Sequence, residues 1–375
     1  MIYLDNAATT FPKPQCMISE INRCISEYCG NAGRSGHYMS LKASEKIYEC
    51  RETLANFFGT SKPENVVFTL NTTYALNIAI KSYFTHGMHV FISNMEHNSV
   101  LRPISALKRD GKIEYSIFNI MQPEKKIIEE LEINKRPETG MLIMPHASNI
   151  CGKTFPIKRI GEFCKKYNII FIVDAAQSAG TNEIQIDNWN IDALCAPAHK
   201  GLYGPQGLGF VIFGQKPPKR TLIEGGNGTN SIYLDMGDQL PEMLESGTIP
   251  APLIAGLDAS VKWLKRIGIS TVKQHETELA TKLTEILFSI PGSIIYGPFT
   301  PETGIVLYDN QNTSLNQIAE KLNKKLICTR SGYHCAPLAH NTLNTGEFGA
   351  LRFSFSYFNN KREIDDVYKT LKNDI

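Results

Sequence analysis

The sequence predicts an α/β protein in which a mainly parallel sheet is sandwiched by helices and followed by a smaller α+β region. Two observations support this prediction. From about residue 40 to residue 200, short apolar runs alternate with segments whose apolar residues recur at helical spacing, and repeated strand–helix–strand units form parallel sheets. After Gly247, the pattern changes to two long helical stretches, then shorter strands and a closing helix.

The expected elements follow one another in a regular order. A helix over residues 40–58 comes first, and the apolar run from Val66 to Leu70 then predicts a short buried strand. The alternation continues with helices expected over 74–84, 99–109 and 157–167, and with strands expected over 89–93, 141–144, 169–173 and 193–196. In the C-terminal region, helices are expected over 252–267 and 271–290 and from residue 361.

The length of the chain predicts more than one structural unit. A chain of 375 residues is longer than a single hydrophobic core usually supports. We expect an N-terminal arm over residues 1–15, a large domain over 16–255 and a small C-terminal domain over 256–375.

The composition argues against several classes of protein. The 39 Lys and Arg residues nearly balance the 37 Asp and Glu residues and are scattered along the chain, so nucleic-acid binding is not expected. No apolar segment approaches the ~20 residues that span a bilayer, and the first residues do not resemble a secretory signal. The nine cysteines show no two-residue spacing, which argues against a disulfide framework and a zinc site. We therefore expect a cytoplasmic protein with no metal site.

Asp174 and Lys200 follow two of the expected strands, at the sheet edge where proteins of this class bind ligands. A carboxylate directly after an apolar run is costly to bury unless it meets a positive group, and a protonated pyridine nitrogen is one such group. An N-cap is the alternative role for Asp174. Lys200 stands on a turn of small residues, where its amine can form a Schiff base. The glycine-rich run after it lacks the Gly-Lys-Ser/Thr ending of a nucleotide loop, which disfavours a nucleotide site.

Two further places in the sequence suggest chemistry. Thr72 and Thr73 stand where a strand gives way to a helix, so their hydroxyls and free N–H groups favour an anion such as phosphate, with plain N-capping as the alternative. Cys335 lies on a loop containing glycine and proline, which suits a group that moves. Positive charge from nearby Arg330 and His334 would favour its reactive thiolate, whereas an inert buried cysteine is the alternative.

These residues belong to a series of motifs that extends over nearly the whole chain. The motifs are Tyr3–Thr10, Asn71–Thr73, Met95–Asn98, His146–Asn149, Asp174–Gln177, His199–Lys200, Glu245–Thr248, Arg330–Cys335 and Leu351–Ser354. In order and spacing, the series resembles the class V aminotransferase family, and within it the group II, SUF-type cysteine desulfurases and selenocysteine lyases. The resemblance implies fold type I of the pyridoxal-phosphate (PLP) enzymes.

The resemblance also implies how the cofactor is bound. Lys200 would hold PLP covalently, Asp174 would pair with the pyridine nitrogen, and Gln177 would hydrogen-bond the phenolic oxygen. His97 would stack on the ring and take part in catalysis together with Lys200 and Cys335.

The phosphate and the subunit arrangement follow from the same resemblance. Thr72, Thr73 and His199 would contact the phosphate. Thr248 would come from the neighbouring subunit, which implies a homodimer with shared active sites.

For the substrate, the resemblance implies L-cysteine or L-selenocysteine. Arg352 would grip the carboxylate in a two-pronged contact, Asn149 would assist it and contact the ring, and Arg330 and His37 would complete the substrate site. Cys335 would take the sulfur as a persulfide, leaving alanine. A small sulfur-acceptor protein would then receive the sulfur, for iron–sulfur cluster assembly, tRNA thiolation or another route.

Three residues depart from the pattern of the family. Pro197 stands where many relatives have serine, Ala198 replaces a glycine, and Asn71 stands where glycine is frequent. These changes affect groups near the phosphate and are expected to alter cofactor affinity rather than the reaction. A selenocysteine lyase, a class V aminotransferase and a non-catalytic PLP-binding scaffold remain the alternative functions.

Overall fold

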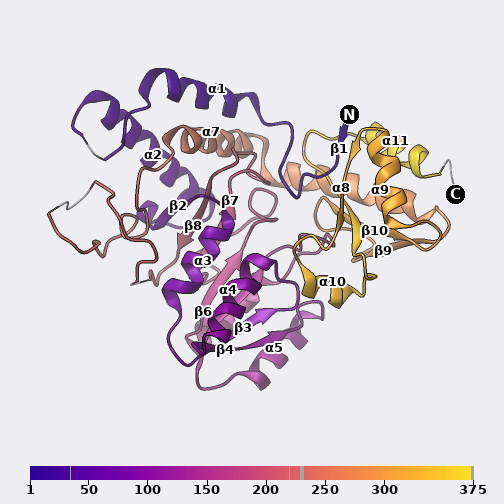
Figure 1. Ribbon diagram of the computed structural model, residues 1–375, viewed down its shortest axis with the longest axis horizontal. Helices are drawn as coiled ribbons and strands as arrows, with labels where there is room; N and C mark the ends of the chain where they lie inside the picture. The colour runs from indigo at the N-terminus through magenta and orange to yellow at the C-terminus, as the bar shows by residue number, and fades with distance from the viewer. Residues whose placement is uncertain (34, 219, 229–231, 373–375) are drawn as a thin grey trace.

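The computed structural model describes residues 1–33, 35–218, 220–228 and 232–372. Figure 1 shows a central sheet with helices packed around it and, beside it, a second group of elements formed by the C-terminal part of the chain. The N-terminus lies next to this second group, close to β1 and α11. The N-terminal residues therefore lie against the C-terminal part of the chain.

The central sheet has seven strands and is mainly parallel, as the alternating pattern predicted. Its spatial order is β2 (Val66–Thr69), β8 (Gly209–Phe213), β7 (Ala193–Pro197), β6 (Ile170–Asp174), β5 (Thr139–Pro145), β3 (Met88–Ser93) and β4 (Ile113–Phe118). Only β8 runs antiparallel to its neighbours. The connection from β7 to β8 contains no helix, so the chain turns back along β7 instead of crossing over the sheet.

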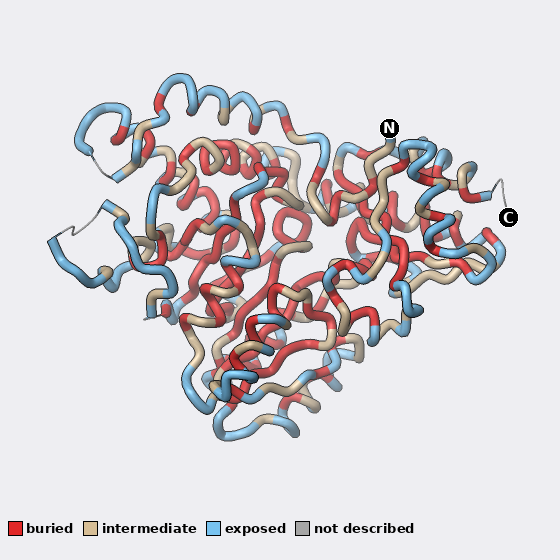
Figure 2. The backbone as a smooth tube through the Cα atoms, in the orientation of Figure 1, coloured by how far each residue is buried: buried red, intermediate tan, exposed pale blue. Residues whose placement is uncertain are grey.

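Helices cover both faces of this sheet. One face packs against α3 (Thr72–Tyr83) and α4 (Asn98–Arg109). The other packs against α2 (Tyr38–Phe57), α5 (Glu124–Asn134), α6 (Ile157–Tyr167) and α7 (Ala251–Ile267). Successive strand residues face opposite sides, so the inner strands are buried on both faces and appear red in Figure 2, whereas the edge strand β4 has exposed residues. The expectation of helices on both faces is confirmed.

The C-terminal part has its own antiparallel sheet and hydrophobic core. Its strand order is β12 (Arg330–Gly332), β13 (Ala350–Ser354), β10 (Ile305–Asn310) and β9 (Ser293–Tyr296). The helices of this part are α8 (Ile269–Phe288), α9 (Leu315–Lys324), α10 (Pro337–Leu343) and α11 (Lys361–Lys372). The N-terminal strand β1 (Ile2–Tyr3) pairs with β11 (Ile327–Cys328), and Leu4 is buried in the same core. The N-terminal arm is thus attached to the C-terminal part.

The packing partners change between two consecutive helices. Helix α7 packs against α2 and α1 (Gln15–Arg23), whereas α8 packs against α11 and the small sheet. Gly268, with φ of 91°, connects the two helices. The predicted boundary at residue 255 lies inside α7, and the division into an arm and two domains remains a prediction. Among the described residues, no helix has the length and apolar character needed to cross a membrane.

Candidate active site

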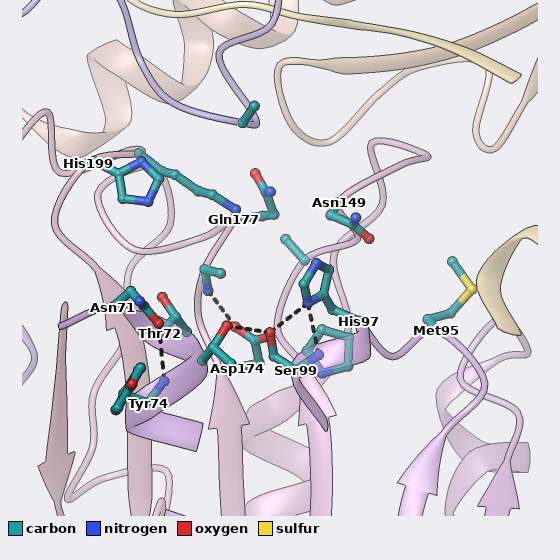
Figure 3. A pocket seen from close by; sticks show the side chains of 16 residues that line it. Asn71, Thr72, Tyr74, Met95, His97, Ser99, Asn149, Asp174, Gln177 and His199 are labelled. Atoms are coloured by element: carbon teal, nitrogen blue, oxygen red, sulfur yellow. Dashed lines mark hydrogen bonds between the residues drawn. The ribbon is translucent and has the colours of Figure 1, made fainter. Parts of the chain in front are cut away.

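A cavity of about 430 Å³ lies where β2, β3, β5, β6 and β7 end, which is the sheet edge predicted from the sequence. Figure 3 shows that side chains from several of these strand ends point into it. The predicted cofactor-binding residues that line the cavity are Thr72, Thr73, His97, Asn149, Asp174, Gln177, His199 and Lys200. The structure therefore brings together residues that are up to 128 positions apart in the sequence, from 72 to 200.

Asp174 is the last residue of β6 and is only 5% exposed. Its Oδ1 accepts a hydrogen bond from the backbone N–H of Ala176 at 2.9 Å. Burial raises the pKa of this carboxyl, although the Ala176 N–H and the charge of Lys200 oppose the shift. A buried carboxylate with this little solvation is stabilised by a cation, so the position suits a protonated ring nitrogen.

Lys200 lies in the same cavity, on the turn after β7. Burial lowers the pKa of its amine to about 8, while the Asp174 carboxylate opposes that shift. The neutral, nucleophilic amine is therefore accessible near physiological pH, as a lysine that attacks an aldehyde requires.

The N-terminal arm holds the backbone next to this lysine. The carbonyl oxygen of His199 accepts hydrogen bonds from Thr10 N at 3.0 Å, Thr9 Oγ1 at 3.2 Å and Lys13 Nζ at 2.7 Å. Thr10 Oγ1 also donates to the carbonyl of Lys200 at 3.1 Å. The arm thus fixes the two residues that were expected to bind the cofactor, and neither Lys13 nor Thr10 was assigned a role from the sequence.

One end of the cavity is built to receive an anion. Helix α3 begins here, and Asn71 caps it by accepting a hydrogen bond from Tyr74 N at 3.2 Å (Figure 3). Among the described residues, the buried Thr72 Oγ1 and His199 Nδ1 have no hydrogen-bond partner. Free polar atoms beside a helix N-terminus favour a phosphate. Asn71 has an extended backbone with φ of −174°, so its place does not require the glycine that is frequent in relatives.

His97 lies on the opposite side of the cavity as the N-cap of α4. Its Nδ1 accepts from Ser99 N at 3.1 Å and is 2.8 Å from Ser99 Oγ, which in turn lies 2.9 Å from Thr73 Oγ1. Burial, reinforced by nearby cations, lowers the pKa of His97 to about 4, so the ring is neutral and carries its proton on Nε2. The imidazole is thereby fixed in orientation, as expected of a ring that stacks on a cofactor.

Cys335 is exposed and lies in a turn between β12 and α10. Its carbonyl accepts from Asn98 N at 2.7 Å, next to His97, and the carbonyl of His334 accepts from Asn149 Nδ2 at 2.9 Å. The thiol was expected on a loop that moves. These two hydrogen bonds hold the turn at consecutive carbonyls, and the movement of the thiol remains a prediction.

Arg330 and His334 were both expected to favour the thiolate by positive charge. The Nη2 of Arg330 lies 3.8 Å from Cys335 Sγ, as that expectation requires. His334 differs, because burial, reinforced by the Arg352 charge, lowers the pKa of its ring to about 3. His334 is therefore neutral at physiological pH, and of these two residues the guanidinium alone carries a positive charge.

Arg352 is in the middle of β13, is 1% exposed and is paired within the protein. Its Nη2 donates to Asp5 Oδ1 at 2.7 Å and its Nη1 to the Asn149 carbonyl at 2.9 Å, whereas Nε has no partner among the described residues. A substrate carboxylate would therefore compete with Asp5 for this arginine. Asp5 belongs to a motif quoted above, but nothing in its local sequence indicated a partner 347 positions away.

Two of the expected site residues, Thr248 and His37, lie outside this cavity. Thr248 lines a different cavity, together with Arg51 and Tyr48. His37 is exposed and caps α2, where its ring accepts from Ser40 N at 3.3 Å. Neither residue reaches the cavity of Lys200 within its own chain, and their roles remain predictions.

The family model for class V aminotransferases matches residues 2–367. Curated relatives include proteins named probable cysteine desulfurase from Methanothermobacter thermautotrophicus (31% identity, 99% of this chain, 94% of the relative) and from Pyrococcus abyssi (30%, 99% and 94%). The chain therefore belongs to the class V aminotransferase family, whose members use PLP, and groups there with the cysteine desulfurases.

Solved structures agree with this assignment. The apo structure of a cysteine desulfurase from Thermococcus onnurineus has a TM-score of 0.89, at 28% identity over 99% of this chain and 94% of that one. A cysteine desulfurase from Escherichia coli has a TM-score of 0.87 at 23% identity, covering 98% and 93%, and so shares the fold. The predicted fold type is confirmed.

The residues of the cavity fit PLP by their chemistry. A buried acid, Asp174, suits the ring nitrogen, and a buried amine of lowered pKa, Lys200, suits the aldehyde. The unpartnered Thr72 hydroxyl and His199 ring nitrogen at the start of α3 suit the phosphate. These complementary groups all line a single cavity.

Proposed function

We propose that this protein is a PLP-dependent cysteine desulfurase of the group II type, which converts L-cysteine into L-alanine and collects the sulfur on Cys335. The observation that carries the proposal is the place of this thiol. It is exposed, in a turn that is hydrogen-bonded to Asn149 and to Asn98, the residue after His97, and both His97 and Asn149 line the cavity that holds Lys200 and Asp174. An ordinary class V aminotransferase has no use for a thiol at this position.

The predicted roles around the cofactor are retained in the proposal. Lys200 would bind it covalently, Asp174 would pair with its ring nitrogen, Gln177 would hydrogen-bond its phenolic oxygen, and His97 would lie against the ring. When bound, the cofactor withdraws electrons from the attached amino acid and so weakens its carbon–sulfur bond. The Lys200 amine, with its lowered pKa, then moves the proton from the substrate Cα.

Arg352 orients the substrate by its carboxylate. The guanidinium is buried and already positioned by the Asn149 carbonyl, so little ordering remains when substrate binds. The substrate carboxylate replaces the Asp5 carboxylate at Nη2 and reaches the free Nε. Arg330 lies beside Cys335 and stabilises the attacking thiolate, while His37 remains a proposed contributor only.

The sulfur transfer balances with the groups present. The Cys335 thiolate attacks the substrate sulfur, a sulfur–sulfur bond forms, and the carbon–sulfur bond breaks. Its electron pair returns to carbon, which a proton completes to give alanine. L-cysteine and the thiol of Cys335 thus yield L-alanine and a Cys335 persulfide, without an external oxidant. The persulfide then passes its outer sulfur to a thiol of an acceptor protein.

The proposal includes a homodimer and a cytoplasmic location. Support for the dimer is the place of Thr248, which lines its own cavity away from Lys200 and is free to complete the phosphate site of a second subunit. The short connection from Cys335 to Arg352, as in group II enzymes, favours dependence on an acceptor protein for fast turnover.

The experiment that tests the function is steady-state turnover of L-cysteine with a reductant, with sulfide and alanine measured together. The wild-type enzyme should form both in equal amounts. Lys200→Ala should abolish both products, and Cys335→Ser should lose at least 100-fold, whereas Cys29→Ser, at another exposed cysteine, should have no effect.

The alternatives give different outcomes in the same assay. If the wild-type protein releases no sulfide and Cys335→Ser still transfers the amino group to a keto acid, the protein is an aminotransferase. If it loses cysteine turnover but retains selenide release from L-selenocysteine, selenocysteine lyase is the function. A wild-type protein that binds PLP but forms no alanine would be a scaffold.

A further inference from the structure

The turn that carries Cys335 has an unusual backbone. His334 has φ of 49° and Cys335 has φ of 57°, so two consecutive residues other than glycine adopt the left-handed conformation. Side chains with a Cβ avoid this region because it brings Cβ close to the backbone. Such a pair persists only where surrounding contacts hold it, and strained backbone of this kind is concentrated at functional sites.

Two buried histidines form a continuous chain of hydrogen bonds beneath this turn. His334 Nε2 lies 3.1 Å from the Arg330 carbonyl, and His334 Nδ1 lies 3.2 Å from His340 Nε2. His340 Nδ1 lies 2.7 Å from Thr345 Oγ1. The two rings are nearly parallel, at 11°, and are 3% and 1% exposed.

The Arg330 carbonyl at one end of these hydrogen bonds determines which nitrogen of each neutral ring carries the proton. The Arg330 carbonyl can only accept, so His334 Nε2 must donate to it. In a neutral ring, His334 Nδ1 is then an acceptor, and His340 Nε2 must supply the proton between the rings. His340 Nδ1 is left to accept from the Thr345 hydroxyl. Every buried nitrogen of the pair is satisfied in this one arrangement.

Protonation of His334 would break this chain of hydrogen bonds. An extra proton on His334 Nδ1 would place two N–H groups face to face at 3.2 Å. Burial lowers the pKa of His334 to about 3 and that of His340 to about 4, which agrees with two neutral rings. The pair is therefore a neutral scaffold rather than an acid or a base.

We propose that His340, acting through His334, positions the thiol of Cys335. The inference rests on the proposed function, in which this thiol accepts sulfur. His334 is bonded on one side to His340 and on the other to the Arg330 carbonyl, so the chain also fixes the spacing across the turn between the guanidinium and the thiol. His340 itself belongs to α10 and was assigned no role from the sequence.

The test compares two replacements of His340 in the PLP-loaded enzyme. His340→Phe retains the ring and its edge contact with Tyr333 but removes both nitrogens. His340→Gln retains an amide donor to His334. His86→Phe, at an exposed histidine in the loop between α3 and β3, is the control. Each variant is measured for kcat and KM with L-cysteine, for PLP absorbance, and for amide exchange of the peptide that contains Cys335.

His340→Phe should lower kcat about tenfold, leave KM and PLP absorbance unchanged, and increase amide exchange in the Cys335 turn. His340→Gln should restore kcat to within about threefold of wild type, and His86→Phe should equal wild type. Should His340→Phe fail to fold, Thr345→Val tests the same chain by removing its first donor, with a smaller loss of kcat expected.

Wild-type kcat and exchange in His340→Phe would overturn the proposal. A loss of kcat that the glutamine does not restore, accompanied by a loss of PLP absorbance, would also overturn it by revealing a general structural defect. Amide exchange does not depend on activity. If Cys335→Ser retains full desulfurase activity, the proposed function fails, while the exchange data still decide whether His340 holds the turn.

Discussion

Replacement of Asp174 by asparagine should separate cofactor binding from folding. Asp174 is 5% exposed, burial raises the pKa of the carboxyl, and among the described residues the carboxylate accepts one hydrogen bond, from Ala176 N at 2.9 Å. An asparagine can accept the same bond without a buried charge. The cofactor-free variant should therefore melt at the same temperature as the wild-type protein or higher.

The loaded enzyme should respond in the opposite direction. A hydrogen bond between charged groups contributes ~1.5–3 kcal/mol, so Asp174→Asn should weaken PLP binding roughly 10- to 150-fold. Ligand binding stabilises the folded state in proportion to the logarithm of ligand concentration over Kd, so the melting temperature gained on adding PLP should shrink. Turnover should fall further still, because the neutral amide cannot hold a proton on the ring nitrogen.

The assay is PLP titration by absorbance, with thermal unfolding before and after loading. Asp192→Asn is a matched control, because Asp192 is also buried, also has a pKa raised by burial, and accepts one backbone hydrogen bond, from Phe171 N at 2.9 Å. It precedes β7, at the other end of the sheet, and should not affect PLP affinity. Unchanged affinity and turnover in Asp174→Asn would refute the role of the acid.

Three further predictions follow from the same site. Burial lowers the pKa of Lys200 from 10.5 to about 8, so the neutral amine forms as the pH rises through about 8. PLP capture by the cofactor-free enzyme, followed by stopped-flow absorbance, should accelerate over the same pH range. A midpoint near pH 10 would contradict this prediction. Asp5→Asn should lower the KM for L-cysteine severalfold, because the substrate carboxylate no longer competes with Asp5 for Arg352. It should also lower the melting temperature, because the buried charge of Arg352 loses its partner. An unchanged KM would show that Asp5 does not compete. Lys13→Met should increase the rate of PLP release severalfold by removing the amine that donates to the His199 carbonyl, whereas release at the wild-type rate would show that the arm does not support the site.

Much of the fold and the cavity could be predicted because the signals are local. The apolar run ending at Asp174 marks both a buried strand and the ligand-binding edge, and the strand end before Lys200 does the same. The antiparallel direction of β8 could not be predicted in this way, because the periodicity of Gly209–Phe213 carries no information on strand direction. Its pairing depends on a connection too short to cross the sheet.

The contacts at the cavity rim depend on parts of the chain that are distant in sequence. Asp5 meets Arg352 because β1 pairs with β11 and brings the N-terminus to the C-terminal part. The hydrogen bonds that hold the Cys335 turn likewise come from Asn98 and Asn149, in loops of the large sheet. The neutral state of His334 depends on burial, which is not visible in a six-residue motif.

The most direct measurement of sulfur transfer is mass spectrometry of the loaded enzyme after one turnover with L-cysteine and no acceptor. The account predicts that the peptide containing Cys335 gains the mass of one sulfur atom, in an amount equal to the alanine formed. Alanine formed while Cys335 stays unmodified, or added sulfur on another cysteine, would contradict it.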